Sequence, residues 1–309
     1  MVPTFRRDSA GQIWLNDERR FAKGVVLTPR TGQVPLVVVA TAEGNTVLEG
    51  PQHAVTEVYS LMGQHDAGDE QDVQNRFRVV IGDDAYRRRL MNRAILCSQV
   101  FGNGLRPFRL LETLVLEPQQ TLSFRFENPS AAGPANFRLA AEGRRFDQHG
   151  EVGLKLAQRF WAAEGPRKSY LAPYWLTTEN PVHLGALGSQ AEALLVNGRD
   201  NSLALGYILC NVITDAEQLG GDTQEIFEFR LFDGTSNREL MNQPVTLNTG
   251  TGTAQFPFRL DPPLLVEPLT NLRVRFTALA SNARDIEIFF TLAGVQCYTG
   301  LAPFAQQGA

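Results

Sequence analysis

Two stretches decide the fold of this chain: Leu114-Val115-Leu116-Glu117-Pro118-Gln119-Gln120-Thr121-Leu122-Ser123-Phe124-Arg125-Phe126 and Leu264-Leu265-Val266-Glu267-Pro268-Leu269-Thr270-Asn271-Leu272-Arg273-Val274-Arg275-Phe276. In each, a short apolar run is followed by Glu-Pro and then by a run in which apolar and polar residues alternate. Alternation with a period of two is typical of a strand with one face on a core, and Glu-Pro predicts a turn. Each stretch therefore predicts two strands with a turn between them, of the kind found in antiparallel sheets that have one face on a core. The order in which the strands pair does not follow from the sequence.

These stretches belong to a longer internal repeat. Residues Phe77 to Phe126 align with Phe227 to Phe276 without a gap, at a constant shift of 150 residues. Roughly a third of the aligned positions are identical, and a repeat of this length has to be recognised before any other pattern. The sequence predicts one module used twice.

Each repeat begins with the pattern of a hairpin. Phe227, Phe229 and Leu231 alternate with polar residues before Asp233-Gly234, and an Asp-Gly pair after such a strand predicts a tight turn because Gly tolerates positive φ. The returning arm, 87–92 or 237–242, fits either a strand or a turn of helix.

The short strands and turn signals predict an all-β fold of two tandem antiparallel β-sandwiches related by internal duplication. The predicted core of the second copy is Phe227, Phe229, Leu264, Leu272, Val274, Phe276, Ile286 and Ile288. The predicted organisation is an N-terminal arm (1–32), a first β-sandwich (33–145), a linker (146–182), a second β-sandwich (183–300) and a C-terminal tail (301–309). Within the linker, residues 153–161 have the pattern of a short amphipathic helix.

Composition excludes several classes of protein. Apolar residues make up 43% of the 309 residues and charged residues 20%, which fits neither a disordered nor a membrane protein. A formal net charge of −4 argues against binding to nucleic acid, which needs an excess of Lys and Arg. The first residues lack the apolar segment of a secretory signal, and no run reaches the ~20 apolar residues of a membrane helix. We expect a soluble protein made in the cytoplasm.

The sequence predicts no cofactor and no metal site. Cys97, Cys210 and Cys297 are odd in number and do not match between the copies, so we expect buried free thiols. The acidic loop 63–72 and its counterpart 214–222 lack the spacing of a calcium-binding EF-hand loop, and a solvated loop is favoured in both. The Gly-containing loops at 101–104 and 248–253 lack the Lys of a phosphate-binding loop.

No catalytic site residues are predicted, and we expect a protein that is not an enzyme. The histidines are His53, His65, His149 and His183, and they form no HExxH motif. Gly-x-Ser-x-Gly is absent. Paired carboxylates for glycoside hydrolysis are not excluded by sequence, since the two can be far apart in the chain.

Aromatic residues gather late in the predicted linker. Tyr170, Tyr174 and Trp175 lie among prolines. Buried packing between the two sandwiches is one interpretation, and an exposed patch for a partner is the other.

One pattern runs from Leu264 to Gly294: an apolar strand, Glu-Pro, an alternating strand and a last strand that ends in Leu-x-Gly. This pattern resembles jelly-roll proteins of bacteriophage virions. A weaker match runs from Leu114 to Gly143. The doubling is similar to the double jelly-roll coat proteins of tailless icosahedral phages, and to decoration, collar and tail-associated jelly rolls of tailed phages.

This resemblance implies a virion structural protein, made in the host cytoplasm, whose partners are copies of itself and other virion proteins. Arg87-Arg88-Arg89 against the acidic loop from Asp66 to Asp72 is one pairing that such contacts could use. The alternative function is a carbohydrate-binding sandwich for attachment to a host surface, in which Tyr170, Tyr174 and Trp175 would contact a glycan.

Overall fold

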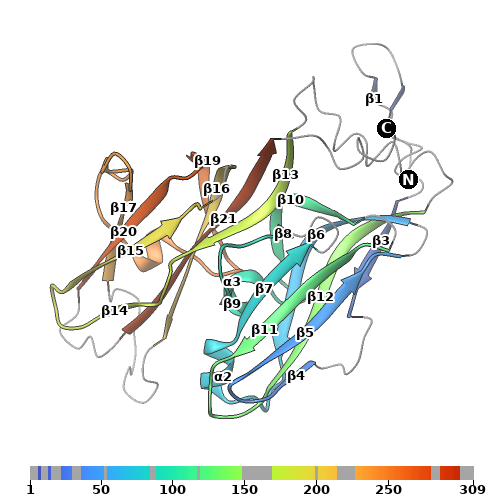
Figure 1. Ribbon diagram of the computed structural model, residues 1–309, viewed down its shortest axis with the longest axis horizontal. Coiled ribbons are helices and arrows are strands. Elements are labelled where there is room, and N and C mark those ends of the chain that lie inside the picture. Colours follow the sequence, from blue (N-terminus) through green and yellow to red (C-terminus); the bar gives the residue numbers. More distant parts are fainter. Residues whose placement is uncertain are drawn as a thin grey trace.

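The computed structural model describes residues 6–7, 13–14, 22–29, 36–51, 54–83, 88–116, 119–147, 169–198, 201–213, 227–279 and 286–299. These residues form two β-sandwiches that lie side by side (Figure 1). A separate pair of short strands, β1 (Arg6–Arg7) and β2 (Ile13–Trp14), precedes them. Within the described part, no helix has both the length and the apolar content to cross a bilayer.

The first sandwich is built from two antiparallel sheets. Its strands are β3 (Ala22–Leu27), β4 (Leu36–Val38), β5 (Ala42–Glu49), β6 (Ala54–His65), β7 (Arg78–Asp83), β8 (Arg88–Arg89), β9 (Ile95–Leu96), β10 (Phe108–Leu116), β11 (Thr121–Asn128) and β12 (Ala135–Asp147). One sheet has the order β10-β6-β12-β3, with β4 also paired to β12, and the other has the order β5-β11-β7-β8, with β9 also paired to β7. Helices α2 (Gln71–Arg76) and α3 (Cys97–Val100) are short connections.

The second sandwich has the same plan. Its strands are β13 (Ser169–Thr177), β14 (Val182–Leu184), β15 (Gln190–Val196), β16 (Ser202–Ile213), β17 (Phe227–Asp233), β18 (Val245–Thr246), β19 (Phe258–Val266), β20 (Asn271–Ala278) and β21 (Ile286–Thr299), with helix α5 (Leu247–Gly250) before β19. One sheet has the order β13-β21-β16-β19, with β14 also paired to β21, and the other has the order β15-β20-β17-β18.

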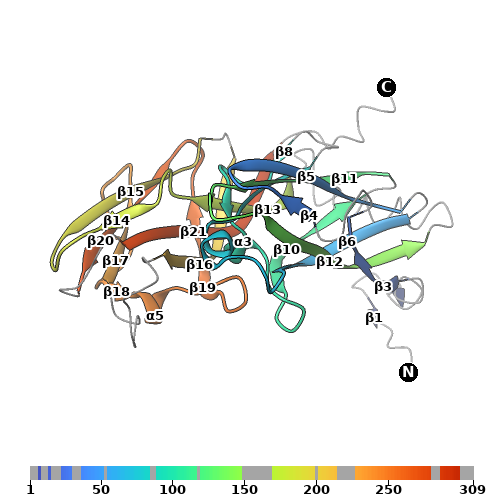
Figure 2. The ribbon, with the colours of Figure 1, turned by 90° about the horizontal axis from the view of Figure 1, so that it is seen from below.

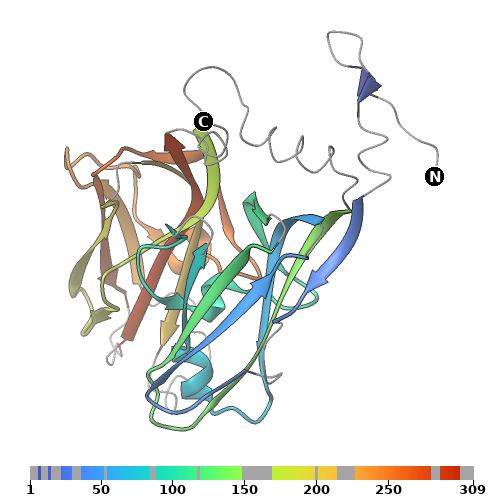
Figure 3. The same cartoon turned by 45° about the vertical axis from the view of Figure 1, so that its right-hand side comes forward.

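The two strand orders correspond except beside β7 and β17: β18 matches β9 in the repeat, and a single bridge between Phe232 and Glu239 stands where β7 pairs with β8. In each sandwich the first strand pairs with the last, β3 with β12 and β13 with β21, and the chain crosses repeatedly between the two sheets. This arrangement of two packed antiparallel sheets is a jelly roll. The predicted all-β class, with two tandem jelly-roll-like sandwiches, is confirmed (Figure 3).

The alternating runs place their apolar side chains inside the sandwiches. Strands β11 and β20 both show strict alternation between buried and half-buried residues along their length. In the second sandwich the predicted core residues are all buried except Leu264, which is half-buried against the same core. Burial of one face only is what an antiparallel sheet in a two-layer sandwich requires.

Among the described residues, the predicted turns of the second copy are present, and the one after β17 differs in detail. After Glu-Pro, Gln119 and Leu269 occupy the left-handed region at φ 65° and 56°. After β17 the hairpin closes through a hydrogen bond from Asp233 N to Arg238 O of 2.9 Å. Its left-handed residue is Asn237, at φ 58°, and not Gly234 as expected. Gly234 is needed for a different reason: a Cβ there would lie 2.7 Å from the carbonyl oxygen of Asn271.

The expected arm and linker each contain a sandwich strand. β3 lies within the range predicted as an arm, 1–32, and pairs with β12. β13 lies within the predicted linker, 146–182, and pairs with β21 along its whole length. β3 and β13 were not predicted as strands because their sequences lack alternation of apolar and polar residues. Pairing with a distant strand makes them extended. The amphipathic helix expected at 153–161 lies outside the described residues.

Candidate functional site: the junction between the sandwiches

The junction between the sandwiches begins with backbone pairing of two segments far apart in the sequence. The segment before β9 runs alongside β13: Trp175 N donates to Leu90 O at 3.0 Å, and Asn92 N donates to Trp175 O at 3.2 Å. The Asn92 side chain continues the pairing, donating to Thr177 O at 2.8 Å and accepting from Thr177 N at 2.9 Å. The first strand of the second sandwich is therefore attached to the first sandwich by main-chain hydrogen bonds.

Trp175 fills the space beneath this pairing. It is 1% exposed and belongs to the apolar core of the first sandwich, although its strand belongs to the second. Its ring lies 5.9 Å from that of Phe108, which in turn lies 5.7 Å from Tyr207. The Trp175 Nε1–H has no hydrogen-bond partner in the part of the chain that the structure describes. The two hydrophobic cores thus meet through aromatic side chains.

A buried polar contact holds α3 against β21. Gln99 Nε2 donates to Phe289 O at 2.6 Å, and Thr291 Oγ1 donates to Gln99 Oε1 at 2.7 Å. Beside it, Leu96, Ile213 and Phe289 form a small apolar cluster drawn from both sandwiches. A buried amide whose hydrogen bonds are satisfied favours one relative orientation of the groups that it joins.

Charged pairs surround the junction. Arg76 Nη1 lies 2.6 Å from Glu287 Oε2, and Arg93 Nη2 lies 2.6 Å from Glu179 Oε1. The Arg106 guanidinium stacks on the ring of Phe256 at 3.9 Å. Pairs exposed to this degree stabilise little individually, by about 0–1 kcal/mol. They add to a contact whose main contribution is apolar burial, and the two sandwiches form one block (Figure 2).

The aromatic residues of the predicted linker lie inside the molecule. Tyr174 and Trp175 are each 1% exposed, so the interpretation as packing between sandwiches is confirmed for Trp175. The expectation that these two rings contact a glycan is wrong, because neither presents a face to solvent. The side chain of Tyr170 lies outside the described residues.

The acidic loop of the first sandwich is tied to its own domain. Asp66 Oδ1 accepts from Arg138 Nε at 2.8 Å, which lowers the pKa of Asp66. Asp72 accepts from Ser130 and from Arg76, and these bonds lower its pKa. The suggested partner of these acids, Arg87-Arg88-Arg89, lies elsewhere: Arg88 and Arg89 form β8, and Arg87 is outside the described residues. Residues 214–222 are also outside them. In the described ranges, no three His, Cys, Asp or Glu side chains are grouped to hold a metal.

Beside this loop lies a hollow of about 810 Å³. His65, Cys97, Phe101 and Gln255 are among the residues that line the hollow. The Nδ1 atom of His65 lies 2.8 Å from Asp69 Oδ2, and the His65 ring contacts Phe77 and Phe137 edge-on. Burial lowers the pKa of His65 despite the nearby carboxylate. Among the described residues, no hydrogen-bond partner lies at the Nε2 atom of His65. His183 is exposed, and His53 and His149 fall outside the described residues.

The cysteines are free thiols, as expected. Cys97 and Cys210 are buried and Cys297 is half-buried. Burial raises the pKa of both Cys97 and Cys210, which makes them unreactive.

Sequence reasoning named Trp175 as a candidate for packing between the sandwiches, and it did not find Asn92 or Gln99. One signal was available: Leu90-Met91-Asn92 is repeated as Leu240-Met241-Asn242. Nothing in the sequence shows that only the first of these segments pairs with a strand of the other sandwich. Gln99 has no counterpart in the repeat, since Thr249 stands at the matching position.

Neither a protein-family model nor a curated protein sequence matches this chain. Among solved structures, the chain is similar to the STIV MCP, with 9% identity and a TM-score of 0.40 over 93% of this chain and 99% of that one. It is also similar to PBCV-1 VP54, with 10% identity and a TM-score of 0.35 over 91% and 96%. The ANXUR2 extracellular domain from Arabidopsis thaliana gives 10% identity and a TM-score of 0.24 over 96% and 95%. Similarities at these TM-scores carry no argument about role.

Proposed function

We propose that this chain is a non-enzymatic structural subunit of a virus particle, of the kind found in phages, which acts by contacts with copies of itself and with other virion proteins. The observation that carries the proposal is the buried junction, which joins two jelly rolls of one strand order into a single block. Jelly rolls of two packed sheets occur in viral capsid and lectin domains. We infer that the two arose by internal duplication.

A rigid block of two similar halves suits a repeating assembly. Symmetric assembly requires complementary patches that are already in place on each subunit, and a fixed angle between the halves keeps such patches in register. The Gln99–Thr291 hydrogen bond and the buried Trp175 support such a fixed angle.

Exposed apolar side chains mark loops that are suited to these contacts. Leu105 is 92% exposed and Phe256 58%, and both lie in the loops that precede β10 and β19. Leu265, near the end of β19, is 76% exposed, and Leu269, in the turn between β19 and β20, is 66% exposed. Apolar atoms at such loops gain from being covered by a neighbour.

The carbohydrate-binding alternative has lost two of the three rings on which it was based, since Tyr174 and Trp175 are buried. The virion role is therefore the one that we carry forward, with localisation in the particle after synthesis in the host cytoplasm.

The experiment is sedimentation and electron microscopy of the purified chain at increasing concentration, together with quantification of the chain in purified particles. We expect concentration-dependent growth into regular arrays, or a defined copy number per particle. Hundreds of copies would indicate a coat or decoration subunit and around a dozen a vertex or tail component. A strictly monomeric protein that also fails to bind particles would refute the proposal.

A further inference from the structure

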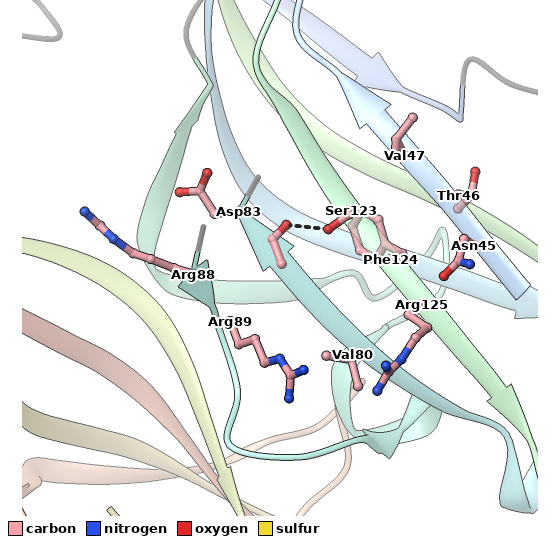
Figure 4. A pocket seen from close by; sticks show the side chains of 11 residues that line it. Asn45, Thr46, Val47, Val80, Asp83, Arg88, Arg89, Ser123, Phe124 and Arg125 are labelled. Atoms are coloured by element: carbon pink, nitrogen blue, oxygen red, sulfur yellow. Dashed lines mark hydrogen bonds between the residues drawn. The ribbon is translucent and has the colours of Figure 1, made fainter. Parts of the chain in front are cut away.

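The outer face of one sheet of the first sandwich carries a groove of about 360 Å³. It lies over β5, β11, β7 and β8, and Figure 4 shows the side chains that surround it. Its floor is made by Gly82 and Ser123, which are opposite each other in the β7–β11 ladder, and Ser123 Oγ donates to Gly82 O at 3.3 Å. These two small residues leave the sheet surface uncovered.

The second sandwich shows what fills the corresponding place there. Phe232 matches Gly82 in the repeat and stands opposite Arg273, which matches Ser123. The Phe232 ring lies between two guanidinium groups, 4.9 Å from Arg273 and 5.1 Å from Arg275. It is only 4% exposed, although it lies on the outer face of its sheet. In the second sandwich, therefore, an aromatic ring held by arginines covers the position that is open in the first.

The guanidinium groups that would hold such a ring are present beside the groove. Arg125 matches Arg275, and in Figure 4 Arg125 and Arg89 lie on either side of Val80. Arg125 contacts Glu127 at 3.2 Å and Glu43 at 3.9 Å, much as Arg275 contacts Glu192 at 2.6 Å while also contacting Phe232. An ion pair on one side of a guanidinium is therefore compatible with an aromatic ring on its face.

The charge at the groove is also different from that in the second sandwich. Arg89 is exposed and pairs with Gly82 across the ladder, and its match in the repeat is Glu239, which bonds to Arg230 at 3.3 Å. Among the residues that line the groove, three arginines (Arg88, Arg89 and Arg125) outnumber the single aspartate, Asp83, while Glu43 and Glu127 contact Arg125 from outside the lining. An occupant that carries carboxylates would complement this excess.

We propose that the groove is a docking site for a partner protein, and that it takes an aromatic side chain flanked by acidic residues. The ring would lie over Gly82 and Ser123, in the position that Phe232 has in the second sandwich, with Arg125 and Arg89 against its face and the carboxylates beside them. Stacking of a guanidinium on a ring favours binding, and it does so more strongly once water is excluded. The site does not depend on the virion role proposed above.

The test uses the full chain, labelled with ¹⁵N, and three blocked tripeptides as probes. Acetyl-Asp-Phe-Asp-amide should shift the amide resonances of Gly82, Arg89 and Ser123 in a saturable way. Acetyl-Asp-Ala-Asp-amide should bind more weakly because it lacks the aromatic ring. Acetyl-Lys-Phe-Lys-amide should also bind more weakly, because the arginines of the groove repel its positive charges.

Four variants distinguish a built site from weak surface binding. Gly82→Phe should abolish binding by supplying the ring that the second sandwich already has. Arg89→Glu, at an exposed position where folding is not at risk, should weaken binding by about tenfold, while Arg259→Glu, an equal charge change on the exposed surface of β19, should leave it unchanged. Phe232→Gly should open a second groove and add saturable shifts around Leu231 and Arg273.

Equal binding of the Phe and Ala peptides would overturn the proposal. So would unchanged binding by Arg89→Glu, or equal losses in Arg89→Glu and Arg259→Glu. A folded Phe232→Gly variant with no new site would remove the comparison on which the inference rests.

Discussion

Replacing Trp175 should weaken the coupling between the two sandwiches, so that they unfold in separate steps. The side chain is 1% exposed, belongs to the core of the first sandwich and lies in a strand of the second. Truncation of a buried Trp to Ala removes its apolar contacts and leaves a cavity, at a cost of about 3–5 kcal/mol. We expect Trp175→Ala to lower the free energy of unfolding by this amount.

Trp175→Phe is the matched control. A Phe ring at this position buries roughly 35 Å² less apolar surface than the Trp ring, which should lower the free energy of unfolding by about 1 kcal/mol. The substitution also removes the Nε1–H, which is buried without a hydrogen-bond partner among the described residues, and an unsatisfied donor costs about 1–3 kcal/mol. The two effects oppose each other, so we expect Trp175→Phe to stay within about 1 kcal/mol of the wild-type stability.

The assay is urea unfolding followed by far-ultraviolet circular dichroism and by the fluorescence of the remaining tryptophans. A chain with two domains unfolds in one step only while the domains are coupled, so Trp175→Ala should split one transition into two. A loss below about 1 kcal/mol in Trp175→Ala, with a single transition, would refute the reasoning. Equal losses in the Ala and Phe variants would also refute it.

Four further outcomes are expected. Burial lowers the pKa of His65 in the folded protein, so as pH falls the unfolded chain takes up a proton at this residue before the folded chain does. The contribution of His65 to the free energy of unfolding is therefore full above its ordinary pKa of 6.5. It is lost as pH falls from there toward the lower pKa of the folded state. The urea midpoint of wild type should therefore drop more between pH 7.5 and 5.5 than that of His65→Gln, and parallel drops would contradict this. Gly102→Ala should lower the free energy of unfolding by about 1–3 kcal/mol, because a Cβ there would lie 2.0 Å from the Arg106 carbonyl oxygen. The control is Gly104→Ala, where a Cβ would meet no described atom within 4 Å, and it should leave the melting temperature nearly unchanged. Equal shifts of melting temperature in the two variants would count against the argument. Gln99→Ala should destabilise by about 1–3 kcal/mol in chemical unfolding, because it removes the amide that donates to the buried Phe289 carbonyl and leaves the Thr291 hydroxyl with Thr177 as its partner. A neutral substitution would show that the Phe289 carbonyl finds another donor. In native protein treated with a thiol reagent, mass spectrometry should show modification of Cys297 before Cys97 and Cys210, which are buried with raised pKa values; early modification of Cys97 would contradict the packing around α3.

Local patterns were sufficient for much of the fold. The alternation in Leu122, Phe124 and Phe126, and in Leu272, Val274 and Phe276, predicted which side chains are buried, because a strand presents successive residues to opposite faces. The turn at Glu267-Pro268 was also predicted correctly, because a turn depends on residues that are neighbours in the chain. Strands without such a pattern, β3 and β13, were assigned to an arm and a linker.

The junction and the groove lay beyond these patterns. Gln99 and Phe289 are 190 residues apart, and no local rule relates a buried amide to a carbonyl at that distance. The groove exists because Gly82 and Ser123 are adjacent across two strands, and its meaning comes from comparison with Phe232 between its two arginines.

The sequence by itself predicted one module used twice, and it determined that the chain is made of strands and which face of the alternating strands is apolar. It did so because the period of side chains along a strand is a property of the backbone. Only the tertiary structure decided that Trp175 leaves its own sandwich for the core of the other, and that one sheet surface is covered while its counterpart is open. Apolar burial has no direction, so the fit of side chains brought together from distant parts of the chain selects which surfaces meet.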